Sequence, residues 1–167
     1  MIKKELENAL FDMEIMAKVF QFEPFEIYLL GGSGCILAGY IDRATRDFDF
    51  IDLDYSAKYG RLFRLLEPFD MIDTMMATIA LSYKERAVRL MQFKYLHIYV
   101  FSREDIIISK MGRLNERDIN DIKAMQPYAD KSLLFELIDE VMERHDLLLK
   151  TREVFSSNSK TIMKDWG

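Results

Sequence analysis

The sequence predicts an α/β or α+β fold in which a small mixed sheet is flanked by helices and followed by a C-terminal helical segment. Three observations support this prediction. A hydrophobic run at 26–30 leads into the glycine-rich turn Gly31-Gly32-Ser33-Gly34, and acids alternate with apolar side chains from Asp47 onward. Apolar residues at three- and four-residue spacing, typical of amphipathic helices, occur near both ends of the chain.

The chain of 167 residues is long enough to bury a sizeable core. We expect a domain over 1–126 that includes the N-terminal helix, and a C-terminal helical segment over 127–167 packed on it, because Pro127 marks a boundary. The formal net charge of −5 does not by itself indicate nucleic-acid binding, although a local basic patch could still support it. The single cysteine, Cys35, excludes an intrachain disulfide. We expect neither a signal peptide nor a membrane span. Together with the single cysteine, this predicts a cytoplasmic protein.

The first half of the chain predicts a phosphate-binding corner. An amphipathic helix over 2–20 is followed by a buried strand over 26–30 that ends in the glycine turn. We expect Ser33 to cap a short helix over 34–41, which leaves backbone N–H groups and the positive end of the helix dipole exposed. The glycines of the turn would let a phosphate approach the backbone closely.

The next strand, at 47–52, carries a pair of acids. Asp47 and Asp49 alternate with Phe48 and Phe50, so the carboxylates share one face if the phenylalanines anchor the strand in the core. Two acids about 7 Å apart along a strand repel each other when both are ionised, and a divalent cation would relieve that repulsion. The alternative is that the glycines form only a turn and the acids only a solvated strand end.

Further elements follow from local patterns along the rest of the chain. They are, in order, a helix at 55–66, a short strand at 71–73, a hairpin of strands at 87–93 and 96–101, and helices that begin at Ser102, Asn115 and Asp130. The polar run Ser156-Ser157-Asn158-Ser159 predicts a break before a frayed tail that ends at Gly167.

A basic and acidic group lies in the predicted helices after Ser102. Lys110, Arg113 and Arg117 are separated by three and four residues, and Asp121 follows one turn later. If the two helices are nearly continuous, these side chains line one face. On spacing alone, a solvated helix face with salt bridges is the commoner outcome.

These motifs together resemble the nucleotidyltransferase fold of the DNA polymerase beta superfamily, whose pattern is Gly-Gly/Ser, a spacer, and Asp-x-Asp. Here the pattern reads Gly31-Gly32-Ser33 and Asp47-x-Asp49. The stretch with Lys110, Arg113 and Arg117-Asp118-x-x-Asp121 is similar to the small bacterial branch around the AbiEii-type toxins, in which a lysine and a later aspartate complete the site. The resemblance covers about 26–125.

The resemblance implies metal-dependent transfer of a nucleoside monophosphate from a nucleoside triphosphate (NTP) to an acceptor hydroxyl. It implies Mg²⁺ or Mn²⁺ bound by Asp47 and Asp49, and catalytic roles for Asp47, Asp49, Lys110, Asp118 and Asp121. The nucleotide phosphates would be held by Gly31, Gly32, Ser33 and Arg113.

One departure from the family pattern concerns a third carboxylate. Many related enzymes carry it on a neighbouring strand, where it helps to activate the attacking hydroxyl, but the strands predicted at 87–93 and 96–101 contain no acid. His97 could replace it, or could be an ordinary hydrogen-bonded histidine. Two outcomes therefore stay open: catalysis through Lys110, Asp118 and Asp121, or a fold that binds nucleotide without transferring it.

The acceptor and the partner are not selected by the residues. Resemblance to toxin–antitoxin enzymes implies an RNA or protein acceptor, and a partner that is either a second copy of the chain or a cognate antitoxin or toxin. The alternatives are a catalytically silent nucleotidyltransferase-like binding or antitoxin protein, and an enzyme that modifies a small molecule such as an aminoglycoside. No membrane partner is expected.

Overall fold

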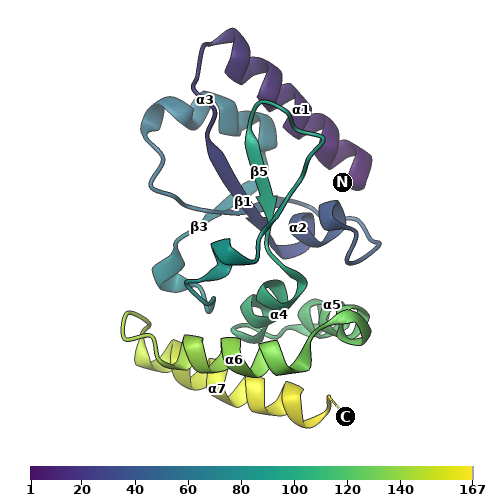
Figure 1. The fold of residues 1–167 in the computed structure, drawn as a ribbon, viewed down its shortest axis with the longest axis vertical. Coiled ribbons are helices and arrows are strands. Elements are labelled where there is room, and N and C mark those ends of the chain that lie inside the picture. The colour runs from purple at the N-terminus through teal and green to yellow at the C-terminus, as the bar shows by residue number, and fades with distance from the viewer. Residues whose placement is uncertain (167) are drawn as a thin grey trace. The chain divides into compact units, whose positions relative to one another are not determined.

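The computed structural model describes residues 1–166 of the chain, which form two compact units (Figure 1). Unit 1 consists of residues 1–72 and 87–100 and contains the sheet. Unit 2 consists of residues 73–86 and of the chain from Phe101 onward, and is built mainly of helices. The domain boundary expected near Pro127 stays a prediction.

Unit 1 is built on a mixed five-stranded sheet of order β3-β2-β1-β5-β4, as the sequence predicted. The central strand β1 is antiparallel to β2 and parallel to β5, while β3 is parallel to β2 and β4 is antiparallel to β5. The strands span β1 Glu26–Leu30, β2 Phe48–Ile51, β3 Phe69–Ile72, β4 Val88–Arg89 and β5 His97–Val100.

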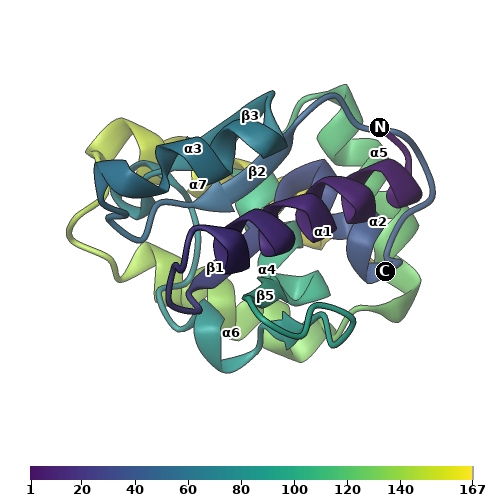
Figure 2. The ribbon, with the colours of Figure 1, turned by 90° about the horizontal axis from the view of Figure 1, so that it is seen from above.

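The helices of unit 1 are α1, α2 and α3, and α1 contacts both of the others (Figure 2). Helix α1 confirms the predicted N-terminal helix, and the helix predicted over 55–66 is three short segments in succession. The bounds are α1 Lys3–Val19, α2 Gly31–Ala38, η1 Ala57–Tyr59, α3 Gly60–Phe63 and η2 Arg64–Leu66. Apolar residues of α1 at three- and four-residue spacing, such as Leu6, Leu10 and Met13, are fully buried.

Two features of the core fix the strands beside the glycine turn. Phe48 and Phe50 are fully buried, so the predicted anchoring of β2 is confirmed. Helix α2 lies directly on β1: a Cβ atom on Gly34 would be only 3.1 Å from the carbonyl oxygen of Leu29. The first turn of α2 is therefore held closely against the sheet.

Unit 2 contains four helices of eight residues or more and three short 3₁₀ segments among the residues that the structure describes. They are η3 Thr74–Met76, η4 Tyr83–Glu85, α4 Arg103–Met111, α5 Glu116–Met125, η5 Gln126–Tyr128, α6 Lys131–Met142 and α7 Leu149–Lys164. Ser102 and Asn115 accept hydrogen bonds from the N–H groups of Asp105 and Asp118, so both predicted helix starts are confirmed.

The predicted break at 156–159 is wrong, because α7 runs through these residues. Phe155, Ser159 and Met163 are buried at four-residue spacing on one side of α7. Tertiary packing thus outweighs the low helix propensity of the Ser and Asn residues. Gly167, the end of the predicted tail, lies outside the described residues.

Arg144 holds the segment 73–86 to the helical part of unit 2. Its guanidinium donates hydrogen bonds of 2.8–2.9 Å to the carbonyl oxygens of Thr74, Ala77 and Ile79, and it also pairs with Asp146 at 2.7 Å. Arg144 is buried, and the bond that it donates to the carbonyl oxygen of Ile79 is buried as well, so this oxygen depends on Arg144 for a donor.

We predict that Arg144→Met lowers the free energy of unfolding by about 2–3 kcal/mol, because the buried carbonyl of Ile79 loses its donor and the part-buried carbonyls of Thr74 and Ala77 lose a hydrogen bond to a charged group. Urea denaturation measures the change. The control Arg64→Met removes an exposed arginine of η2 and should change stability by less than about 0.5 kcal/mol. Equal stability of the two variants would contradict the role given to Arg144.

Candidate active site

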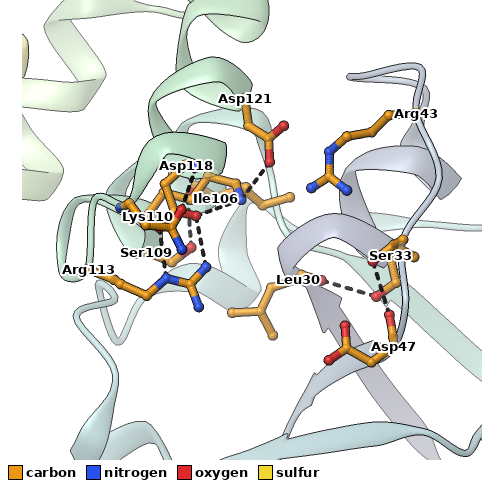
Figure 3. A network of polar contacts seen from close by, with 12 residues as sticks. Leu30, Ser33, Arg43, Asp47, Ile106, Ser109, Lys110, Arg113, Asp118 and Asp121 are labelled. Atoms are coloured by element: carbon orange, nitrogen blue, oxygen red, sulfur yellow. Dashed lines mark hydrogen bonds and ion pairs between the residues drawn. The ribbon is translucent and has the colours of Figure 1, made fainter.

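The glycine turn begins α2 without a side-chain cap. The helix starts at Gly31, three residues earlier than predicted, and ends at Ala38, so Ser33 lies in its first turn and is not its N-cap. The Ser33 hydroxyl is buried and donates to the carbonyl oxygen of Leu30 at 3.3 Å (Figure 3). The same hydroxyl accepts the N–H of Asp49 at 3.1 Å. Ser33 therefore ties the turn to β2.

Gly31 is required by its conformation and by its neighbour. Its φ of +63° is a left-handed value that glycine adopts at little cost. A Cβ atom at this position would be 2.1 Å from Oδ2 of Asp49, which is far inside van der Waals contact. The carboxylate of Asp49 thus lies directly against the first residue of α2.

Gly32 faces the loop that leads into β2. A Cβ atom on Gly32 would be 2.9 Å from Oγ1 of Thr45 and 3.0 Å from Nη2 of Arg43. A guanidinium group therefore lies over the helix start, where the backbone N–H groups and the helix dipole also favour an anion. The phosphate-binding role of this corner stays a prediction, and the structure places the guanidinium of Arg43 beside it.

Three carboxylates gather next to this corner. Asp49 on β2 and Asp70 on β3 are direct partners in the parallel strand pair. Oxygen atoms of Asp47, Asp49 and Asp70 lie within 4.8 Å of one another; the first two residues are half-buried and Asp70 is exposed. Like charges at this separation repel strongly, and carboxylate oxygens are the ligands that divalent cations such as Mg²⁺ and Ca²⁺ prefer.

Asp70 corrects the expectation that a neighbouring strand lacks a third acid. The strands predicted at 87–93 and 96–101 contain no acid, whereas β3 carries Asp70 beside the other two carboxylates. The alternation of Phe69-Asp70-Met71-Ile72 was the available signal, but the pairing of β3 with β2 is a long-range contact. Within residues 1–166, His97 does not join this group of possible ligands.

A second polar cluster lies within unit 2, at the corner between α4 and α5 (Figure 3). Nζ of Lys110 is 2.9 Å from Asp121 and 3.4 Å from Asp118, and Arg113 forms two bonds of 2.9 and 3.0 Å to the Asp118 carboxylate. The two helices are not continuous, because the turn between them includes Leu114 at a φ of +54°. The group lies across a corner and not along one helix face.

The charges of this cluster balance. Lys110 is 6 % exposed, whereas the side chain of Arg113 is 70 % exposed. Burial acts to raise the pKa of Asp118, but the hydrogen bond from Arg113 and the charge of Lys110 outweigh it and hold that pKa below its ordinary value. The catalytic roles of Lys110, Asp118 and Asp121, and the phosphate contact of Arg113, stay predictions.

Comparison with known proteins identifies the family of this chain. The model of a family described as "Nucleotidyltransferase of unknown function (DUF6036)" matches residues 8–165. The chain belongs to this family. No curated protein and no solved structure matches it.

Membership of DUF6036 agrees with the glycine turn and the three carboxylates of unit 1, and indicates an NTP as the substrate. It identifies a nucleotidyltransferase family and no narrower branch. Within the described part of this DUF6036 protein, no helix is both long and apolar enough to cross a bilayer.

We predict that Gly31→Ala destabilises this DUF6036 protein by about 2 kcal/mol more than Gly39→Ala does. Both glycines have a positive φ, so both substitutions strain the backbone, but a Cβ atom on Gly39 meets nothing within 4 Å. Urea denaturation of the two variants measures the difference. Similar losses would show that Asp49 does not crowd Gly31.

We also predict a pH dependence that arises from Asp118. Because its pKa is lowered in the folded protein, its stabilisation is complete above the ordinary value of 3.8 and is lost as the pH falls through the folded-state pKa. Between about pH 5 and pH 2.5, unfolding free energy should therefore fall more steeply in the wild type than in Asp118→Asn. Parallel curves from urea titrations at each pH would contradict this assignment.

Proposed function

We propose that this protein is a metal-dependent nucleotidyltransferase that moves a nucleoside monophosphate from an NTP to an acceptor hydroxyl. The observation that supports the proposal best is the set of three carboxylates, Asp47, Asp49 and Asp70, beside the first turn of α2. An anion site and a cation site that adjoin each other are what a metal–triphosphate complex requires.

The three carboxylates suit a hard divalent cation. Their oxygens lie close enough together to share one ion, and the exposed position of Asp70 leaves room for substrate. We assign Mg²⁺ or Mn²⁺ to Asp47, Asp49 and Asp70. When bound, the cation would neutralise phosphate oxygens and act as a Lewis acid toward the transferred phosphoryl group.

The phosphates are assigned to the helix start. Backbone N–H groups of Gly31, Gly32 and Ser33 and the guanidinium of Arg43 offer donors there. The Ser33 hydroxyl already bonds to Leu30 and to the Asp49 N–H, so its part is to hold β2 against the turn.

The reaction requires a nucleophile and a proton acceptor. The acceptor hydroxyl oxygen attacks the α-phosphorus, the bond from this phosphorus to the bridging oxygen breaks, and pyrophosphate leaves with the electron pair. We assign Asp70 as the group that takes the hydroxyl proton, because it is the most exposed of the three carboxylates.

For the cluster at the corner between α4 and α5, we propose that Asp118 and Asp121 hold Lys110 in place. The salt bridges described above support this positioning role. The resemblance gives Lys110, Asp118 and Asp121 direct catalytic roles and gives Arg113 a phosphate contact. Lys110→Met tests whether Lys110 contacts the substrate, since a residue that touches the nucleotide changes its KM as well as kcat.

The acceptor is proposed from the resemblance to AbiEii-type toxins alone: an RNA or a protein, in a cytoplasmic toxin–antitoxin system. The same fold without transfer, acting as a binding or antitoxin protein, is the competing reading, and modification of a small molecule is a further one. Product analysis distinguishes these classes.

We predict that incubation with each α-³²P-labelled NTP, Mg²⁺ and cell extract transfers label to a macromolecule. Asp47→Asn, Asp49→Asn and Asp70→Asn should each lower the rate by on the order of 10²- to 10³-fold, because each removes a metal ligand or the base. Asp54→Asn, which changes an exposed acid just after β2, is the matched control and should leave the rate unchanged.

If all three variants still transfer label at the wild-type rate, the assignment of the active site to these aspartates is wrong. Binding of nucleotide and Mg²⁺ by the wild type with no labelled product from any NTP would favour the catalytically silent reading. Nuclease or protease treatment of the labelled product identifies RNA or protein as the acceptor, and a low-mass product identifies a small molecule.

A further inference from the structure

An open groove of about 670 Å³ runs along α7, beside the C-terminal end of α6, and belongs to unit 2 alone. Helices α6 and α7 lie side by side (Figure 1). The groove residues of α7 recur every three or four positions, so they form one face of the helix, and Met142 of α6 adjoins them.

This face of α7 differs from the packed face. Phe155 and Met163 are buried within unit 2, whereas Leu149 at the start of the groove is 64 % exposed. Ser156 and Ser157 lie near the middle of the groove-lining face, where their small side chains would let another helix approach closely.

The charged residues of the groove could pair with those of a second copy of the same groove. Glu153 and Lys160 line the groove on either side of the Ser156 and Ser157 pair, about two helical turns apart. If α7 meets a second α7 antiparallel, with Ser156 opposite Ser157 of the partner subunit, Glu153 faces Lys160 of the partner subunit. Two-fold symmetry repeats this pair on the other side. A parallel arrangement would instead place identical charges opposite each other.

We propose that this groove is the docking surface for a second copy of the chain, with the two α7 helices antiparallel about an axis between Ser156 and Ser157. Helix α7 has 16 residues and is therefore about 24 Å long. With a helix diameter of about 10 Å, a contact along α7 covers on the order of 240 Å² per partner, which is less than a standard interface of about 800 Å² per partner. The dimer is thus reversible and depends on protein concentration.

Sedimentation velocity of the full chain from about 1 to 300 μM tests the proposal, and the wild type should shift from monomer to dimer. Glu153→Lys and Lys160→Glu each place like charges in both contacts and should weaken dimerisation about tenfold or more. An equimolar mixture of these two variants should dimerise as the wild type does, because both contacts again join opposite charges.

Two matched variants control for charge alone. Lys150→Glu on α7 and Glu136→Lys on α6 change exposed residues that do not line the groove, and both should dimerise like the wild type. Circular dichroism checks that every variant is folded. A wild type that stays monomeric, single variants that dimerise normally, or a mixture that fails to recover would each overturn the proposal.

Discussion

The close approach of the Asp49 carboxylate to Gly31 is the constraint on which the candidate site depends. A side chain at residue 31 would occupy the space of Oδ2 of Asp49, so the Asp49 carboxylate can lie against the start of α2 only beside a glycine. The hydrogen bond from the Asp49 N–H to Ser33 fixes the same approach from the backbone side. The Asp49 carboxylate and the start of α2 therefore lie next to each other, where a metal–triphosphate complex could contact both.

The third acid, Asp70, is placed by the pairing of β3 with β2. Because β3 is parallel to β2, it enters the sheet in a register that places Asp70 beside Asp49. Three carboxylates close together repel one another in a protein without a counter-charge, and a bound cation would relieve that repulsion. The cluster of Lys110, Arg113, Asp118 and Asp121 is different, since its charges neutralise one another.

Local patterns were sufficient for part of this structure. The alternation at 47–50 predicted β2 and its buried phenylalanines, and the side chains of Ser102 and Asn115 predicted two helix starts. Features that depend on long-range contacts could not be predicted from local patterns. The place of Asp70 beside Asp49 depends on the pairing of β2 with β3. The helix through the polar serine run depends on the packing of the buried side of α7. The positive φ of Gly31, at the first residue of α2, also has no local signature beyond the glycine itself.

The central claim is that Asp47, Asp49 and Asp70 form one cation site, and direct titration of Mn²⁺ followed by electron paramagnetic resonance tests it without relying on turnover. The account predicts saturable Mn²⁺ binding by the wild type that Mg²⁺ displaces, and its loss in Asp49→Asn and Asp70→Asn while both variants stay folded. Equal Mn²⁺ binding by the wild type and these variants would contradict it.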